Sequence, residues 1–370
     1  MYIKSLKLQN FRNYAEESFA FDPAVNLICG ENGQGKTNLL EAAAACSTMR
    51  LFRTAQKKEG LRFGENHAFI FADFAAQERD ISLELRFSRT KAMEIYKNGV
   101  RQKRQSDTQG LLKTVLFCPE DLMLVRAGAA ARRRFLDTAL CQMRPNYARY
   151  LEEYNRLHEH KTRILRDSEE KPSLLSMWED FSLRMAHIGA QIIRYRAYYC
   201  RKLLKAAAAV YADIAPHEVL SGVYKTVSSV SDPFADARTI EKQLIDHVFS
   251  HKTAEIAAKS CLSGPHKDDL ELLLDGRSAA SFGSQGQVRT CTLSLKLAER
   301  ELFFDEDGEY PVLLLDDVLS ELDRRRQDFV LNRISAGQVM ITCCEDGISE
   351  KLRAGAVFHI QNGKKSAETH

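Results

Sequence analysis

The chain has 370 residues, 44% of them hydrophobic and 28% charged, which is ordinary for a soluble globular protein and long enough for about two domains. The net charge of +3 is too small to indicate a nucleic-acid partner by itself, so the arrangement of the basic residues matters more than their number. Because no apolar run approaches roughly 18 residues and no signal peptide is evident, we expect a cytoplasmic protein with no membrane partner.

The nine cysteines fit that expectation, because they form neither a CxxC pair nor a regular framework. Cys29, Cys118 and Cys343 lie in apolar, strand-like runs, where a thiol behaves as a small hydrophobe. Cys343 and Cys344 are adjacent, which argues against a bridge between them. We therefore expect reduced thiols, and no cluster of residues has the spacing of metal ligands.

The first elements expected from the pattern are strands followed by a phosphate-binding loop. Residues 1–8 alternate as a strand does, and the apolar run 25–29 predicts a buried strand. Directly after it, residues 30–37 fit the pattern G-x-x-x-x-G-K-[ST]. Residues 38–45 then predict a helix whose N-terminal dipole favours an anion. An ordinary glycine-rich turn, the alternative, would not explain the strand and helix on either side.

This loop predicts a nucleotide and Mg²⁺ as cofactors. Glycines permit positive φ, so successive backbone N–H groups can turn toward phosphate oxygens. Lys36 would reach the β- and γ-phosphates, and the Thr37 hydroxyl would hold Mg²⁺. Arg12 precedes the strand that enters the loop, so its guanidinium either folds back to the nucleotide or stays on the surface. The loop residues are Gly30, Glu31, Asn32, Gly33, Gln34, Gly35, Lys36 and Thr37.

The region after the loop helix predicts an antiparallel sheet laid beside the nucleotide core. Residues 47–53 form a basic connection that contains aromatic and apolar side chains. Asn98-Gly99 is a two-residue hairpin signal. The strands expected here are 69–74, 81–87, 93–96 and 115–118, the last closed by the turn 119–121.

From about residue 119 to residue 215 the pattern is helical. The longest periodic run alternates steps of three and four residues, as a heptad seam does. At about 1.5 Å per residue, some forty residues would make a rod of roughly 60 Å. We predict an inserted arm of two or three antiparallel helices, and a helical subdomain packed flush on the core is the alternative. The seam residues are Trp178, Phe181, Met185, Ile188, Ile192, Tyr195 and Tyr199.

After residue 216 strand and turn signals return, and a second helix start follows. Residues 263–269 form a polar turn before an expected strand. Ser284 and Gly286 stand directly before an amphipathic helix at 290–304. A serine and a glycine at a helix N-terminus fit either a second anion site or an ordinary capped helix start.

The run 312–317 consists of apolar residues that end in two carboxylates, which describes a buried parallel strand with acid at its tip. In a phosphate-loop protein that tip holds Mg²⁺. We assign Asp316 to the Mg²⁺ shell with Thr37, and Asp317 to the attacking water as general base or orienting group. A polar strand end without chemistry is the alternative. Further strands are expected at 270–274, 339–342 and 357–361.

The predicted division of the chain is an N-terminal part of the nucleotide domain at 1–118, the helical arm at 119–215 and a C-terminal part of the nucleotide domain at 216–370. Basic clusters occur at 101–104, 132–134 and 324–326. Each cluster is either a nucleic-acid contact or a solvated face.

The order of these motifs resembles the ABC-type ATPase heads of the SMC group and, within that group, the RecF family of bacterial recombination and gap-repair proteins. The resemblance implies an α/β fold, namely an ABC-type P-loop ATPase head with a mixed sheet and an inserted all-helical arm. The motifs that carry it are 8–14, 30–38, 52–54, 119–122, 132–137, 263–269, 284–289 and 313–323.

The resemblance also implies ATP as the nucleotide and a composite site. Ser284 and Gly286 of a second subunit would close over the ATP held by the first, so ATP would hold an ATP-dependent homodimer together. Asp323 would lie in the turn that spans the dimer. Catalysis would depend on Lys36, Ser284 and Asp317. Further residues of the nucleotide site would be Arg12, Asn32 and Asn38.

Such a dimer would bind double-stranded and gapped DNA through largely sequence-independent phosphate contacts, and weak, DNA-stimulated ATP hydrolysis would release it. RecF-like proteins work with RecR and RecO to direct RecA onto gapped DNA. The resemblance therefore links the chain to DNA replication, DNA repair and the SOS response.

Some features depart from related ATPases. Gly283 replaces the leucine of transporter signatures, Asp317 stands where transporters have glutamate, and Thr342 takes the place of the switch histidine. These departures argue against the nucleotide subunit of a membrane transporter, and the arm is too short for a full SMC protein. The turn 119–121 is the nearest candidate for a glutamine loop. The remaining alternatives are another SMC-like head and a DNA scaffold that binds nucleotide without significant hydrolysis.

Overall fold

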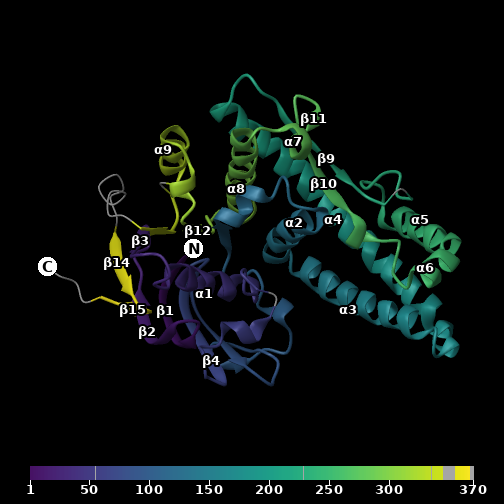
Figure 1. Ribbon diagram of the computed structural model, residues 1–370, viewed down its shortest axis with the longest axis horizontal. Coiled ribbons are helices and arrows are strands. Elements are labelled where there is room, and N and C mark those ends of the chain that lie inside the picture. Colours follow the sequence, from purple (N-terminus) through teal and green to yellow (C-terminus); the bar gives the residue numbers. More distant parts are fainter. Residues whose placement is uncertain (55, 228, 335, 345–354, 367–370) are drawn as a thin grey trace. The chain divides into compact units, whose positions relative to one another are not determined.

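The computed structural model describes residues 1–54, 56–227, 229–334, 336–344 and 355–366 (Figure 1). The chain divides into two compact units, Met1–Met123 with Thr292–His370 (unit 1) and Leu124–Cys291 (unit 2). Helix α8 (Gln285–Asp307) begins in unit 2 and ends in unit 1. No helix within the described ranges combines the length and the apolar character needed to cross a membrane. The three-part division at residues 118 and 215 stays a prediction.

The central sheet of unit 1 has the strand order β15-β14-β3-β13-β12-β8. Strand β15 pairs antiparallel with β14, and the other neighbours pair parallel, so the sheet is mixed as predicted. Every residue of β12 and β13 is buried, which explains their continuous apolar sequences. The strands are β3 (Val25–Cys29), β8 (Thr114–Phe117), β12 (Val312–Asp316), β13 (Val339–Cys343), β14 (Ala356–Gln361) and β15 (Lys364–Lys365).

A second, antiparallel sheet of unit 1 has the order β2-β1-β4-β5-β6-β7. The predicted hairpin at Asn98-Gly99 joins β6 to β7, with φ of 49° and 77° at the two turn residues. Strand β2 was not among the elements predicted from sequence. The strands are β1 (Tyr2–Phe11), β2 (Tyr14–Ala20), β4 (His67–Ala76), β5 (Arg79–Ser88), β6 (Glu94–Lys97) and β7 (Val100–Arg101).

Helix α1 (Lys36–Thr48) lies between these two sheets, because it packs on β8, β12 and β13 from one and on β4 and β5 from the other. Its residues Leu39 to Ser47 are all buried, as expected for a helix that is covered on more than one side. The loop that joins β3 to α1 therefore lies at the carboxyl end of β3, next to the N-terminus of α1. The remaining helical elements of unit 1 are η1 (Lys57–Gly60), η2 (Gln105–Asp107), η3 (Pro119–Met123), η6 (Leu319–Glu321) and α9 (Arg324–Arg333).

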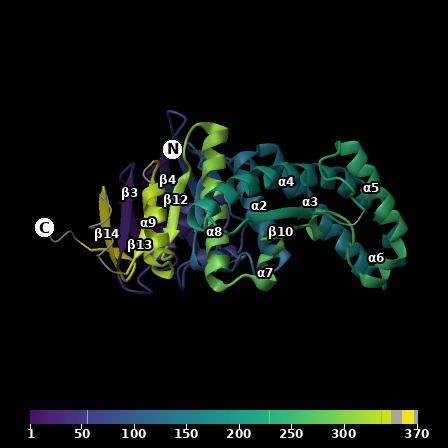
Figure 2. The same ribbon diagram turned by 90° about the horizontal axis from the view of Figure 1, so that it is seen from above.

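Unit 2 is built around the long helix α4 (Trp178–Ile214), whose 37 residues extend for about 56 Å. Helix α3 (Pro145–Asp167) runs alongside it (Figure 2). The predicted heptad seam lies inside this packing: Trp178 and Met185 are buried, and Tyr195 meets Tyr147 edge-on with ring centroids 5.6 Å apart. The other elements here are α2 (Ala129–Met143), η4 (Pro172–Met177) and α7 (Ala279–Phe282).

A three-stranded antiparallel sheet of order β11-β10-β9 covers part of α4 and α2. A Cβ atom at Gly222 would lie 2.6 Å from the Glu271 carbonyl oxygen and 2.8 Å from Leu204 Cδ2, so only glycine lets this strand lie so close to its neighbours. The strands are β9 (Leu220–Lys225), β10 (Asp269–Leu274) and β11 (Arg277–Ser278), and the short turn η5 (Pro265–Lys267) precedes β10.

The strand and turn character expected after residue 216 is only part of what the structure has there. Helices α5 (Ala237–Ser250) and α6 (Lys252–Ala258) also lie in this region, and α5 packs on α4. The Asp236 carboxylate caps α5 by accepting from the backbone N–H groups of Arg238 and Thr239. Ile240, Leu244 and Val248 are buried at four-residue steps, a helical period that the sequence reading overlooked.

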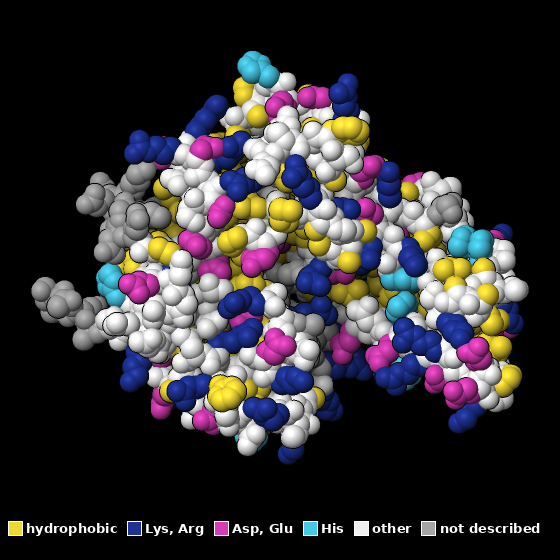
Figure 3. Space-filling model, viewed as in Figure 1, with side chains coloured by type: hydrophobic (Ala, Val, Ile, Leu, Met, Phe, Trp, Pro, Cys, Tyr) yellow, Lys and Arg dark blue, Asp and Glu magenta, His cyan; other side chains and the backbone are white. Residues whose placement is uncertain are grey.

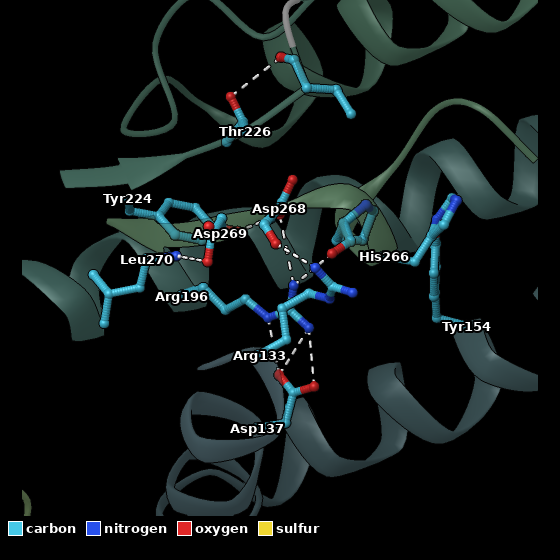
Figure 4. Close-up of polar contacts among 12 residues, drawn as sticks. Arg133, Asp137, Tyr154, Arg196, Tyr224, Thr226, His266, Asp268, Asp269 and Leu270 are labelled. Carbon is cyan, nitrogen blue, oxygen red and sulfur yellow. Dashed lines mark hydrogen bonds and ion pairs between the residues drawn. The ribbon is translucent and has the colours of Figure 1, made fainter. Parts of the chain in front are cut away.

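A buried charge network joins α2, α4 and the segment 263–269 (Figure 4). Arg196 donates to both oxygens of Asp137 at 2.9 Å and to the Pro265 carbonyl oxygen at 2.7 Å. Its guanidinium also lies 3.6 Å from Asp268 Oδ2, which accepts a hydrogen bond from Tyr224. We call Asp137, Arg196, Tyr224 and Asp268 the Arg196 network. It explains why Asp268, in the polar turn predicted at 263–269, is buried although it is acidic.

Candidate nucleotide site

The loop between β3 and α1 has the backbone conformation expected of a phosphate cradle. Gly30, Gly33 and Gly35 have φ of 149°, 81° and 118°. A Cβ atom at Gly30 would lie 2.4 Å from the Ile360 carbonyl oxygen, and one at Gly35 would lie 2.6 Å from Asn13 Nδ2. Both positions therefore require glycine. No side chain caps the helix that follows, so the first N–H groups of α1 are available to an anion.

The loop is held from outside by two turns. Asn13 Nδ2 donates to the Gln34 carbonyl oxygen at 2.8 Å, and the Tyr14 hydroxyl donates to the Gly35 carbonyl oxygen at 2.9 Å. From the turn after β14, the Gly363 N–H also donates to the Gln34 carbonyl oxygen, at 2.9 Å. Asn38, one of the predicted site residues, donates to Asn13 Oδ1 at 2.8 Å. These contacts occupy carbonyl groups and leave loop N–H groups for a ligand.

Lys36 lies across the loop, and its side chain is almost entirely buried. Its Nζ donates to the carbonyl oxygens of Gly30 at 2.5 Å and Glu31 at 3.0 Å, and lies 3.5 Å from Cys344 Sγ. Asn32 Oδ1 accepts from the same thiol at 3.1 Å. Within the described ranges Lys36 forms no ion pair, so the ammonium charge lacks a balancing anion, which the phosphates of a nucleotide would supply.

Asp316 lies at the tip of β12, where the sequence placed it. Its Oδ1 accepts from the Thr37 hydroxyl and from the Thr342 hydroxyl, both at 2.9 Å. Burial raises the pKa of the Asp316 carboxyl, the charges of Glu120 and Asp317 raise it further, and the two hydroxyl hydrogen bonds lower it. Strand β8 brings Glu120 to this edge because it pairs parallel with β12.

These residues fit Mg²⁺. A buried carboxylate beside two other carboxylates and a threonine hydroxyl supplies the oxygen donors and the negative charge that this ion prefers. The described residues contain no group of three or more His, Cys, Asp and Glu side chains able to hold a metal without other ligands. Mg²⁺ usually keeps several water molecules and shares its coordination with substrate phosphates.

Asp317 is the half-buried residue that follows the strand tip, and its φ of 52° is unusual for a residue with a side chain. Its N–H donates to the Thr342 hydroxyl at 2.8 Å, and the Ser320 hydroxyl donates to its carbonyl oxygen at 2.7 Å. Thr342 thus contacts both acidic residues. Sequence reasoning gave Thr342 the place of the switch histidine but missed this bridge, since the bridge depends on the pairing of Asp316 with Thr342 across the two strands.

Arg12 has a partner that the sequence reading did not foresee. Its Nε and one terminal nitrogen donate to the two carboxylate oxygens of Glu41 at 2.7 and 3.1 Å, and its other terminal nitrogen donates to the Glu59 carbonyl oxygen. Glu41 is fully buried in α1. The signal for this ion pair was a single acidic residue in the apolar run that follows the loop. A contact between Arg12 and the nucleotide stays a prediction.

Ser284 and Gly286 belong to unit 2, at the N-terminus of α8. The Ser284 hydroxyl accepts from the Gln287 N–H at 3.2 Å, and the Ser284 N–H donates to Gln287 Oε1 at 2.8 Å. This reciprocal arrangement is a capping box. Gly283 is held by Arg126, which donates to its carbonyl oxygen at 2.8 Å. The capped helix start expected as one alternative is therefore present, and the anion site stays a prediction.

Asp323 begins helix α9 of unit 1. Its carboxylate accepts from the Arg326 N–H at 3.0 Å and pairs with the Arg326 guanidinium. These contacts, the backbone hydrogen bond first, lower the pKa of Asp323. The structure thus brings together Lys36, Thr37, Asp316 and Asp317 in unit 1 and places Ser284 and Gly286 in unit 2.

A mixed sheet with a glycine-rich loop at one strand end and paired acids at another is the arrangement of a phosphate-loop nucleotide-binding domain. The family model described as RecF/RecN/SMC N terminal domain matches residues 2–366. A solved structure of an Smc head domain with an extended coiled coil, from Pyrococcus furiosus, has the same fold, with a TM-score of 0.55 at 14% identity over 99% of this chain and 95% of that one.

Within this class the chain belongs to the RecF family. It is 37% identical to the DNA replication and repair protein RecF of Lactobacillus johnsonii over the full length of both chains. It is 35% identical to the protein of the same name from Clostridium tetani, over 98% of this chain and 99% of that one. A solved structure of the recombination mediator protein RecF with ATP, in the RecFOR pathway, matches with a TM-score of 0.91 at 31% identity, over 99% of this chain and 98% of that one.

Proposed function

We propose that the protein binds ATP with Mg²⁺ at the loop Gly30–Thr37, assembles on DNA as an ATP-dependent dimer, and serves DNA replication and recombinational repair. The observation that carries the proposal is the convergence of Lys36, Thr37 and Asp316 at one edge of the central sheet. The relatives support the biological setting, because they are named DNA replication and repair proteins. The solved RecF–ATP structure supports the choice of nucleotide.

Nucleotide binding follows from the charges of the loop. Lys36 exchanges its carbonyl contacts for the β- and γ-phosphate oxygens, and the loop N–H groups and the start of α1 bind the remaining oxygens. Thr37 and Asp316 hold Mg²⁺, which neutralises charge on the phosphates when it is bound. Asn32 lines the loop, and Arg12 with Glu41 fixes α1 behind it.

Hydrolysis is slow and ends the dimer's stay on DNA. Asp317 orients a water molecule and takes a proton from it as its oxygen bonds to the γ-phosphorus, while the bond to the β-phosphate oxygen breaks and ADP leaves with phosphate. Thr342 holds Asp316 and the Asp317 backbone in place for this step. Turnover is weak because Asp is shorter than the glutamate of faster enzymes.

The dimer closes when Ser284 and Gly286 of one copy contact the triphosphate bound to the other, with Asp323 in the turn between them. ATP then links two copies around double-stranded or gapped DNA, where the protein works with RecR and RecO to load RecA. The capping box is compatible with this part, since in it the Ser284 hydroxyl accepts from the Gln287 N–H and its own hydrogen can donate to a phosphate oxygen.

Sedimentation tests the composite site. With ATP, Mg²⁺ and a gapped duplex, the wild-type protein should sediment as a dimer, whereas Ser284→Arg should bind ATP and stay monomeric. Ser173→Arg places the same residue at an exposed position of unit 2 and should still dimerise. A dimer that persists in Ser284→Arg would remove the composite site from the proposal.

The rate of phosphate release distinguishes a protein that hydrolyses ATP from a scaffold that only binds it. The wild-type rate should exceed background and rise with duplex DNA, and Asp317→Asn should lower it to background without weakening ATP binding. Asp305→Asn, at an exposed position of α8, serves as the control. If the rates of wild type and Asp317→Asn both matched background, the scaffold that binds nucleotide without hydrolysing it would be favoured.

A further inference from the structure

Between residues 185 and 212, the charged side chains of helix α4 are all basic. From residue 185 to residue 212 the sequence contains no Asp or Glu. Arg196 points into the Arg196 network, whereas the other basic residues of this stretch recur at steps of three, four and seven, which return to one side of a helix. We call this side the α4 basic face, and its residues are Arg194, Tyr198, Arg201, Lys202 and Lys205.

The cations of this face are not compensated within the protein. Arg201, Lys202 and Lys205 are exposed, and in the described part of the chain none of them forms an ion pair. Arg194 is half-buried, and its Nε atom, buried from solvent, lacks a hydrogen-bond partner there.

Aromatic rings hold one of these cations in place. The Arg201 guanidinium carbon lies 4.9 Å from the centroid of the Tyr198 ring and 4.8 Å from that of Phe234, and these two rings meet edge-on. Cation–π contacts of this kind orient an arginine and leave its N–H groups available to bind phosphate. The carboxylates on either side of Phe234 are engaged elsewhere: Asp232 accepts from the Phe234 N–H and Asp236 caps α5.

The basic clusters that stand out in the sequence differ from this face, because in each of them one arginine forms an ion pair with a nearby acid. On the face drawn in Figure 3, Lys and Arg side chains lie interspersed with Asp and Glu. Arg133 donates to the Asp268 carbonyl oxygen at 2.6 Å and so belongs to the interior of unit 2. Ion pairs join Arg132 to Asp269, Arg101 to Glu94 and Arg326 to Asp323.

Helix α3 is a closer comparison, since it also exposes basic residues at seven-residue steps. Arg149, Arg156 and Arg163 are exposed, but acidic residues lie among them, and Arg163 pairs with Glu159 at 2.8 Å. Such a mixture is typical of a solvated helix surface. The acidic residues of this part of α3 are Glu152, Glu153 and Glu159.

We propose that the α4 basic face binds the phosphodiester backbone of DNA, an inference that rests on the proposed function. From Arg194 to Lys205 the helix rises by about 17 Å, which matches about five steps of one DNA strand at about 3.4 Å each. Contacts of this kind read no base and therefore suit a protein that must act at gaps of any sequence. Tyr198 positions Arg201 rather than contacting a base edge.

The test compares two triple variants that lose the same charge from unit 2. One is Arg201→Gln with Lys202→Gln and Lys205→Gln, and its control is Arg149→Gln with Arg156→Gln and Arg163→Gln. Affinity for a gapped duplex is measured over a range of salt concentrations with ATP present. Unfolding followed by Trp178 fluorescence and ATP affinity, measured for each variant, establish that both remain folded.

The α4 variant should bind DNA at least about tenfold more weakly at physiological salt, and its plot of log affinity against log salt should be shallower by about 2 to 3. The α3 variant should change that slope by less than about 1. If wild type and the α4 variant bind DNA equally, the proposal is overturned. It is also overturned if the face binds an acidic protein segment instead of DNA. If wild type binds no DNA, the proposed function fails first, and the inference fails with it.

Discussion

Two buried polar clusters of this molecule look alike in burial but differ in how their charges are compensated. In the Arg196 network of unit 2, the guanidinium meets carboxylates of Asp137 at 2.9 Å and Asp268 at 3.6 Å. In the cluster of Lys36, Thr37, Asp316 and Thr342 in unit 1, the ammonium contacts carbonyl oxygens and the carboxylate contacts hydroxyls. The first cluster pairs its charges internally, although Asp268 Oδ1 has no hydrogen-bond partner among the described residues, and the second is suited to accept a ligand.

The comparison teaches that burial and a shifted pKa do not by themselves identify a functional site. Burial raises the pKa of Asp268 to about 6, against the opposing effect of Arg196, and it also raises the pKa of Asp316. What separates the two is whether the protein provides the opposite charge. By this measure Asp316 and Lys36 call for Mg²⁺ and phosphate, whereas Asp268 is served by Arg196 and Tyr224.

Disrupting the Arg196 network should have the largest effect, and that effect should be on stability. Arg196→Ala leaves the buried carboxylates without their cation, so the free energy of unfolding of unit 2 should fall by about 3–5 kcal/mol. Trp178 is the single tryptophan of the chain and lies in unit 2, so urea unfolding followed by its fluorescence reports on that unit. Arg163→Ala, which removes only an exposed ion pair, should cost less than about 1 kcal/mol. Similar values for both variants would show that the network contributes little.

Disrupting the cluster around Lys36 should leave stability almost unchanged and should weaken ATP binding instead. Lys36→Ala removes a cation that would bind phosphate, which should weaken ATP binding by about 1.5–3 kcal/mol, or roughly 10- to 100-fold. Titration with a fluorescent ATP analogue measures this loss. Lys103→Ala, an exposed position of unit 1, should bind as wild type does. Unchanged ATP affinity in Lys36→Ala would mean that the nucleotide does not occupy this loop.

The stability of the region around the Arg196 network should also depend on pH, through the neighbouring His266. His266 accepts from the Tyr154 hydroxyl at Nδ1 and donates to the Cys261 carbonyl oxygen at Nε2, which suits the neutral ring. Burial, helped by His158, Lys267 and Arg133, lowers the pKa of His266 to about 3. As pH falls below about 6.5, His266 binds a proton in the unfolded chain but stays neutral in the folded protein. The free energy of unfolding therefore decreases on the acid side.

His266→Gln measures this contribution. Between about pH 7.5 and about pH 5, wild type should lose about 1–2 kcal/mol more unfolding free energy than His266→Gln. Urea unfolding at both pH values, followed by Trp178 fluorescence, gives the difference. His160→Gln removes an exposed histidine of α3 and should follow wild type. A parallel loss in wild type and His266→Gln would assign the acid sensitivity to other groups.

The smallest effect should come from the bridge between the two acids of unit 1. Thr342→Val keeps the side-chain shape but removes the hydroxyl that contacts Asp316 and the Asp317 N–H. Each hydrogen bond contributes about 0.5–1.5 kcal/mol, so ATP hydrolysis should slow roughly 5- to 10-fold, with a smaller change in ATP affinity. Phosphate-release and ATP-titration assays separate the two. Thr342→Ser restores the hydroxyl and should restore the rate; a serine variant as slow as the valine variant would assign the effect to packing.

Much of the fold and half of the candidate site could be predicted because their signals are local. The strand at 25–29 was predicted with the bounds that the structure has, since an apolar run followed by glycines leaves little choice. The phosphate loop and the acidic end of β12 are likewise continuous in the sequence. The helices after residue 216 were missed because turn signals around them outweighed the period of Ile240, Leu244 and Val248.

By itself, then, the sequence determined which segments have the right composition for phosphate and metal, because glycine conformation, strand patterning and acid placement act over a few neighbouring residues. Only the tertiary structure decided which charges meet. The contact between Thr37 and Asp316 joins residues 279 positions apart in the sequence, and the contact between Arg196 and Asp137 joins residues 59 positions apart. No local sequence pattern predicts either contact. The same reason explains why one arginine of each basic cluster pairs with an acid, while the dispersed cations of α4 form no ion pair within the described residues.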